Sequence, residues 1–141
     1  MPVRNKPLVF WCAAALGAAS LLVLGNFDPA GSGIFPPCPL HALTGWYCPG
    51  CGSLRALHQL LHGNLRTAFA FNPFAVLSLP FLIYGAASHA SLQIRGRALP
   101  RKFIPARWIW ALCAAIVLFG VARNLPVYPL NLLAPGGMLR P

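Results

Sequence analysis

The sequence almost lacks acidic residues. Asp28 is the single acid among 141 residues, against eleven lysines and arginines, and charged residues of both signs make up only 9% of the chain. Soluble domains usually contain about 25% charged residues. Because 57% of the residues are hydrophobic, the polar surface is too small to cover a soluble globule. The composition therefore favours a protein whose solvent is lipid.

The basic residues lie at the ends of apolar segments, as membrane topology requires. They do not form a dense run interleaved with exposed aromatic residues, so we do not expect the protein to bind nucleic acid. We interpret the positive charge as an orientation signal and as an attraction to a lipid bilayer that contains anionic lipids.

Three apolar segments are long enough to span a bilayer, at about residues 8–25, 73–91 and 105–123. The first contains seventeen uncharged residues from Leu8 to Leu24. A cleaved signal peptide is the alternative for this segment, but the apolar run continues past its small residues, which favours a retained anchor.

The two later spans carry clear boundary signals. Asn72 can cap the second helix and Pro73 fits its first turn, while Pro80 predicts a kink. Trp108 and Trp110 suit the interface at the start of the third span. The tail, residues 124–141, contains four prolines between apolar residues. It cannot span, and we expect it to lie along the interface.

The orientation follows from the distribution of positive charge on the two sides of three spans. One side has seven basic residues: Arg4, Lys6, Arg95, Arg97, Arg101, Lys102 and Arg107. The other side has four: Arg55, Arg66, Arg123 and Arg140. The excess of positive charge predicts a multi-pass protein of the bacterial cytoplasmic (inner) membrane with its N-terminus in the cytoplasm. Residues 26–71, a cysteine-rich loop and a short helix, then face outward.

The outward segment contains a set of metal ligands. Its spacing is Cys38-x2-His41-x6-Cys48-x2-Cys51. Three thiols and one imidazole are the number and type of ligands that a tetrahedral zinc site uses. We therefore predict a metal site, with zinc as the expected ion, in a structural or sensory role.

The same cysteines support two other functions. A CxxC motif at the start of a helix suits thiol–disulfide exchange, with Cys48 attacking and Cys51 resolving. A disulfide that only staples the loop would instead suit an adaptor for a membrane protein partner. The sequence does not decide among these functions, nor whether the protein is an enzyme. All of them predict one cluster of the three outward cysteines, with His41 approaching only if a metal is bound.

A stripe of polar residues continues from the motif along the following helix. Cys51, Arg55, His58 and His62 follow a 4-3-4 spacing, which places them on one face of the helix. We expect Arg55, His58 and His62 to support the cysteine site. The alternative is the water-facing side of an interfacial helix. With about ten residues the helix is too short to span, so we expect it to be interfacial or re-entrant.

The segment from CPLHALTGWYCPGCG to FNPF resembles a family of small bacterial membrane proteins catalogued as a domain of unknown function. The shared features are CPGCG at 48–52, Arg55-Ala56, the Leu-Leu-x-Gly at 60–63 and Asn72-Pro73. Cys38-Pro39 and the later Arg123-Asn124-Leu125-Pro126 also resemble the family. The resemblance implies a multi-span helical protein and no particular activity. The position after Gly63, often acidic in that family, is Asn64 here, which argues against a carboxylate partner for Arg55.

Together these patterns predict a single all-α membrane domain over residues 1–141. We expect three transmembrane helices and one short re-entrant or interfacial amphipathic helix.

Overall fold

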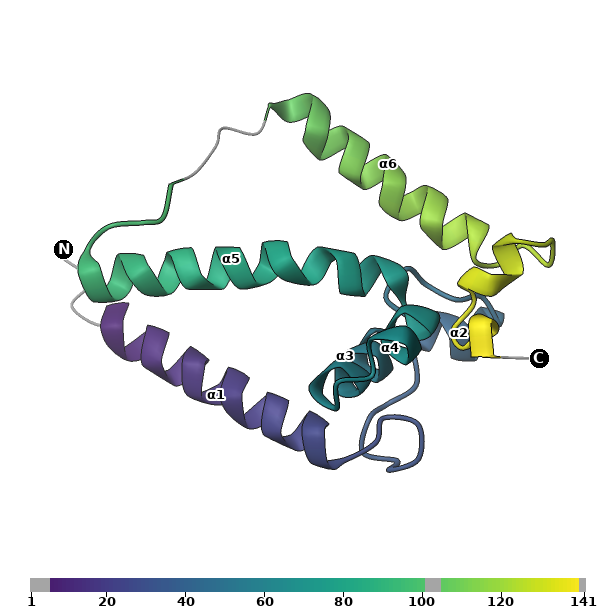
Figure 1. Ribbon diagram of the computed structural model, residues 1–141, viewed down its shortest axis with the longest axis horizontal. Coiled ribbons are helices and arrows are strands. Elements are labelled where there is room, and N and C mark those ends of the chain that lie inside the picture. Colours follow the sequence, from purple (N-terminus) through teal and green to yellow (C-terminus); the bar gives the residue numbers. More distant parts are fainter. Residues whose placement is uncertain (1–5, 101–104, 140–141) are drawn as a thin grey trace.

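The computed structural model describes residues 6–100 and 105–139, and within these ranges every regular element is helical (Figure 1). The six α-helices are α1 (Lys6–Asn26), α2 (Pro39–Thr44), α3 (Ser53–Leu61), α4 (Leu65–Phe71), α5 (Pro73–Arg95) and α6 (Ala106–Ala122). Two 3₁₀ helices follow, η1 (Leu130–Leu133) and η2 (Gly137–Leu139). The predicted all-α class is confirmed. Arg4, Arg101, Lys102 and Arg140, which contribute to the expected orientation, lie outside the described residues.

Two of the described helices, α1 and α5, are long and apolar enough to cross a membrane, judged by length and composition. Their most apolar windows are only 6% and 11% buried within the protein, so neither helix is the core of a soluble globule. The third predicted span, α6, is a shorter apolar helix of 17 residues. At 1.5 Å per residue it is about 26 Å long, somewhat less than the ~30 Å of a bilayer core.

The boundaries of the long helices agree with the sequence signals. The side chain of Asn72 accepts a hydrogen bond from the backbone N–H of Ala75 at 3.0 Å, so it caps α5 as predicted. This helix runs through Pro80 and continues to Arg95, four residues beyond the predicted end at 91. Gly96 ends it in the left-handed conformation (φ 69°), and its N–H donates to the carbonyl of Leu92. Glycine adopts this conformation without a steric cost.

The segment between the first two long helices contains more helix than the sequence predicted. One short helix was expected there, and it is present as α3, but α2 and α4 were missed. Both are too short, at 6 and 7 residues, to show an apolar period. The small core lies here, with Ala56, Ala68 and Val76 buried. The C-terminal segment returns to this core, where the N–H of Gly136 donates to the carbonyl of Ala70 at 3.0 Å.

All three long helices have one end at this middle segment (Figure 1). The last turn of α1 is hydrogen-bonded to α3 through Leu24 and His58. Asn72 joins α4 to α5, and Arg123 directly follows the end of α6. The cysteine motif therefore lies in a segment that contacts one end of each long helix, and α1 reaches this segment through α3.

Candidate metal centre

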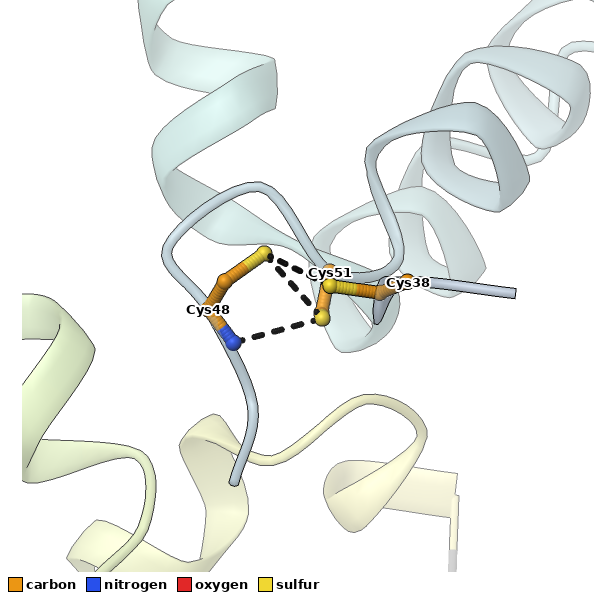
Figure 2. A group of neighbouring side chains, drawn as sticks. All are labelled: Cys38, Cys48 and Cys51. Carbon is orange, nitrogen blue, oxygen red and sulfur yellow. Dashed lines mark hydrogen bonds between the residues drawn. The ribbon is translucent and has the colours of Figure 1, made fainter. Parts of the chain in front are cut away.

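Cys38, Cys48 and Cys51 form one cluster (Figure 2). The Sγ of Cys48 is 3.4 Å from that of Cys38 and 3.2 Å from that of Cys51, and all three sulfurs lie within 4.8 Å of one another. The three thiols are free. Their spacing is longer than a disulfide bond of about 2.05 Å. It is close to the ~3.8 Å that two ligands 2.3 Å from a tetrahedral zinc would have. The predicted cluster is confirmed.

The CPGC segment is a tight turn that brings two of these sulfurs together. The N–H of Cys51 donates to the carbonyl of Cys48 at 3.0 Å, and the N–H of Ser53 donates to that of Gly50 at 3.0 Å. The backbone N–H of Cys48 points back at the Sγ of Cys51, 3.3 Å away. An amide directed at a sulfur stabilises the thiolate, which is the form that binds metal and attacks disulfides.

Gly52 makes the turn from the motif into α3 possible. Its φ is +83°, and a Cβ at this position would lie 2.7 Å from the backbone oxygen of Phe71. Both the left-handed backbone and the close approach of α4 therefore require glycine. This explains in physical terms why the motif ends in glycine.

The first cysteine enters the cluster from the start of α2. Cys38 is the N-cap residue of that helix, and Pro39 occupies its first turn. At the other end Gly45 (φ 74°) reverses the chain toward the CPGC turn. The sequence signals at Pro39 and Gly45 thus close a short loop that returns Cys48 to Cys38.

The backbone of the motif is held by Arg123, which is only 1% exposed. Its Nη1 donates to the carbonyls of Cys48 (3.0 Å) and Pro49 (3.1 Å), and its Nη2 donates to that of Cys51 (3.0 Å). The guanidinium also lies over the ring of Phe119, with Cζ 4.9 Å from the ring centroid. A planar, fork-shaped group can bind three carbonyls of one turn at once.

Asn72 holds the same turn from the side of α5 and is fully buried. Its Nδ2 lies 2.9 Å from the carbonyl oxygen of Pro49, 3.2 Å from that of Cys51 and 3.0 Å from Oγ of Ser53. The residue therefore caps α5 with its oxygen and fixes the CPGC turn with its nitrogen.

Asn124 fixes the approach to the turn. Its Oδ1 accepts a hydrogen bond from the N–H of Tyr47 at 2.7 Å, and its Nδ2 donates to the carbonyl of Tyr47 at 2.9 Å. This paired contact mimics a strand partner for Tyr47. It places the residue before Cys48 against the end of α6.

The thiols of Cys38 and Cys51 have different pKa values because their surroundings differ. The backbone N–H of His41, helped by hydrogen bonds with Cys48 and Cys51, lowers the pKa of Cys38 to about 7. Burial, followed by hydrogen bonds with the other two thiols, raises the pKa of Cys51 to about 12. Cys38 is thus the thiol that becomes a thiolate near neutral pH.

The structure brings together three of the four predicted metal ligands. The ring of His41, the fourth, is exposed and held elsewhere. Its Nδ1 lies 3.0 Å from the carbonyl oxygen of Gly45, and the ring stacks on Tyr47 with centroids 4.4 Å apart. His41 lies outside the group of three sulfurs because this hydrogen bond and this stack orient the imidazole.

The predicted polar stripe is divided between two places. Cys51 belongs to the sulfur cluster, whereas the Nδ1 of His58 lies 2.6 Å from the carbonyl oxygen of Leu24, at the end of α1. His62 contacts His58, with ring centroids 4.4 Å apart. Arg55 is half-buried. His58 therefore ties α1 to α3, whereas His62 contacts only His58.

The residues that sequence reasoning missed are those that hold the motif from a distance. Asn72 was expected only to cap α5, and Arg123 was expected only to end the third span. The one sequence feature that pointed to them was that Asn72 and Arg123 both belong to motifs that resemble the family of unknown function. No periodicity or local spacing connects residue 123 to residue 48.

Comparison with curated proteins gives no match, and comparison with solved structures gives none either. One family model does match, and the matched segment begins at the first cysteine of the cluster and includes α2, α3, α4 and the first half of α5. Over residues 38–86 the chain matches the family described as "Protein of unknown function (DUF2752)", which confirms the resemblance drawn from its CPGCG motif.

Proposed function

We propose that the protein is a membrane module that binds one zinc ion through Cys38, Cys48 and Cys51. The observation that carries this proposal is the convergence of three free sulfurs within 4.8 Å of one another. The turn that presents them is held by Arg123 and Asn72, two buried side chains from different helix ends. A site held from several helices is preorganised for an ion rather than assembled by it.

The proposed role of the ion is structural or sensory. A zinc ion on these sulfurs would link α2 to the CPGC turn, and through Arg123 and Asn72 to the ends of α6 and α5. With three protein ligands the ion keeps a fourth position for His41, water or another donor. If the position takes an incoming ligand, the site would be sensory; if His41 fills it, the site would be structural.

Metal content and thiol state, measured on one purified sample in detergent, test this function. We expect about one zinc per chain by mass spectrometry of the metal, with no disulfide. The single variants Cys38→Ser, Cys48→Ser and Cys51→Ser should lose the zinc. Cys12→Ser and Cys113→Ser are the matched controls, because these cysteines are exposed on α1 and α6 and lie outside the cluster.

Thiol–disulfide exchange is the second candidate function, and the 3.4 Å between the sulfurs of Cys38 and Cys48 favours it. Cys48 was expected to attack and Cys51 to resolve, but hydrogen bonds lower the pKa of Cys38 to about 7, whereas burial raises that of Cys51 to about 12. The Cys38 thiolate would therefore attack a substrate disulfide and displace one substrate sulfur as a thiolate. The Sγ of Cys48 would then attack the Sγ of Cys38 in this mixed disulfide and displace the second substrate sulfur. Two electrons would pass to the substrate and leave a Cys38–Cys48 disulfide. A metal-free sample with an exchangeable disulfide would support this function over zinc binding. A disulfide that does not exchange would support the stapled adaptor for a membrane protein partner.

We further propose that α1, α5 and α6 all cross the bacterial cytoplasmic membrane. The exposed apolar surfaces of α1 and α5 support this, because lipid can cover them and water cannot do so without cost. The shorter α6 would span through local thinning of the bilayer, with Trp108 in its first turn at the interface. Anionic lipid would attract the basic residues between α5 and α6, and the cysteine cluster would face outward.

A membrane-impermeant thiol reagent applied to intact cells tests this orientation. Cys38 is the residue to label, since it is more accessible than the buried Cys51. Labelling after removal of metal and mild reduction, without lysis, is the expected result. Labelling only after lysis would place the cluster in the cytoplasm. A Cys38→Ser variant controls for reaction at the other thiols.

A further inference from the structure

Arg123 is the only charged side chain that is buried among the described residues. A buried cation without a compensating anion is strongly unfavourable. Its two Nη atoms bind three carbonyl oxygens, but carbonyls are neutral, and its Nε has no hydrogen-bond partner within the described part of the chain. The site therefore contains one full positive charge that these contacts do not neutralise.

The sequence offers one carboxylate side chain, and it does not serve Arg123. Asp28 is exposed in the loop after α1, and its Oδ1 accepts a hydrogen bond from the N–H of Ala30 at 2.9 Å. The titratable side chains next to Arg123 are those of Cys48, Cys51 and Tyr47, whose ring centroid lies 6.0 Å from Cζ of Arg123. Of these, the thiols are the groups that a bound metal would convert to anions. Two of the three carbonyls that the guanidinium binds belong to Cys48 and Cys51, which also supply two of the clustered sulfurs.

The net charge is zero if the three cysteines bind one divalent ion as thiolates. Three thiolates and one divalent ion carry a net charge of −1, and the guanidinium carries +1. We propose that Arg123 is the fixed counter-charge of a zinc–trithiolate cluster and that it thereby restricts the fourth zinc ligand to a neutral donor, an imidazole or a water. This inference rests on the proposed zinc site. It adds the cation that determines which net charge the zinc and its ligands can carry.

We assign the counter-charge to Arg123 and not to Arg55, although Arg55 is one helical turn from Cys51. Arg55 is half-buried, so solvent screens its charge. Arg123 is buried in a region of low dielectric, where a unit charge acts more strongly on its neighbours. Arg123 is a positioning residue, since its contacts are with the ligand backbone and not with the ion.

Zinc affinity, measured by competition with a chelator in detergent, tests the counter-charge. We expect Arg123→Gln to weaken binding about 100-fold, the order expected when a unit charge is removed from close to the cluster at an effective dielectric near 20. Arg123→Lys keeps the charge but loses the planar fork that binds three carbonyls, so it should recover most of the affinity lost in Arg123→Gln and stay within about tenfold of wild type. Circular dichroism would confirm that each variant keeps its helices.

Asn72→Ala is the matched control. Asn72 binds two of the same carbonyls, those of Pro49 and Cys51, but its amide is neutral. If loss of loop contacts alone explains the effect, Asn72→Ala and Arg123→Gln will weaken zinc binding equally, and Arg123→Lys will not rescue it. That result would overturn the counter-charge and leave the zinc site intact. A wild-type protein without zinc affinity would overturn both.

The restriction on the fourth ligand has a test that needs no change at Arg123. In His41→Ala protein loaded with cobalt(II), the visible spectrum reports the ligand at the open position. We expect imidazole to bind at lower concentration than azide, because azide would leave the buried site with an uncompensated negative charge. Tighter binding of azide than of imidazole would overturn the proposal, even if the Arg123→Gln variant failed to fold.

Discussion

Arg123 and Cys48 are 75 residues apart in the sequence, yet Nη1 of Arg123 lies 3.0 Å from the backbone oxygen of Cys48. This contact joins the end of α6 to the CPGC turn. With the contacts of Asn72 and Asn124, it makes the geometry of the sulfur cluster depend on the packing of the long helices.

Gly52 and Gly63 flank α3 and test which property of glycine the motif needs. Both have positive φ, 83° and 76°, but only at Gly52 would a Cβ meet backbone, 2.7 Å from the oxygen of Phe71. Gly63→Ala should cost about 1 kcal/mol of unfolding free energy, from left-handed backbone strain alone. Gly52→Ala should cost about 1–3 kcal/mol more, from overpacking. Urea unfolding in detergent, followed by circular dichroism, measures the difference; equal losses would show that α4 moves aside without cost.

Gly120 and Gly85 form a second matched pair, within α6 and α5. A Cβ at Gly120 would lie 3.0 Å from Cγ of Pro49 in the CPGC turn, whereas nothing lies within 4 Å at Gly85. Gly85→Ala should stabilise the protein by up to about 1 kcal/mol through helix propensity. Gly120→Ala should lose that gain and weaken zinc binding, because Pro49 must shift. Thermal unfolding and zinc competition measure both effects, and similar stabilisation by the two variants would argue against close packing of α6 on the turn.

The lowered pKa of Cys38 predicts a pH profile for alkylation of the reduced, metal-free protein. With a pKa of about 7, its thiolate fraction and its reaction rate should rise about tenfold per pH unit below pH 7 and level off above it. Cys51, with a pKa of about 12, should stay unmodified by iodoacetamide between pH 6 and 9. Mass spectrometry of the peptides separates the two sites. Modification of Cys51 before Cys38 would contradict the assignment.

His58 is expected to hold α1 against α3 without acting on the metal. Its Nδ1 contacts the backbone oxygen of Leu24 at 2.6 Å, whereas the Nδ1 of His62 lies 2.8 Å from the backbone oxygen of His58, one turn earlier in the chain. His58→Ala should broaden the distance distribution between spin labels on α1 and α3, and His62→Ala and Gln59→Ala should not. Zinc affinity should stay within about threefold in all three variants. A large loss of zinc in His58→Ala and His62→Ala, but not in Gln59→Ala, would restore the polar stripe as one site.

Local sequence signals predicted the long helices well. Uncharged apolar runs, the Asn72-Pro73 start and the change to proline-rich sequence after Arg123 are each properties of neighbouring residues, so they can be read without a structure. The short helices α2 and α4 were missed because each has fewer than two turns. Packing against α3 and the C-terminal segment stabilises α4, whereas α2 buries no residue.

The clustering of the three cysteines was also determined locally. Ten residues separate Cys38 from Cys48, and CPGC is a turn by its own chemistry, so loop closure brings the sulfurs together at small entropic cost. The orientation of His41 was not determined in this way, because a side-chain rotamer depends on its neighbours. Tyr47 and the carbonyl of Gly45 set it here.

Only the tertiary structure decided which charge lies beside the cluster. From the sequence, Arg55 was the nearest cation by spacing, while Arg123 was the last residue of an apolar segment. Burial places Arg123 against the backbone of Cys48 and Cys51, because a guanidinium removed from water must find acceptors, and the turn has three carbonyls to offer. The sequence by itself determined the sulfurs and the apolar helices, since both depend on short-range spacing. The packing of α6 determined their electrostatic partner, since contacts over 75 residues leave no local pattern.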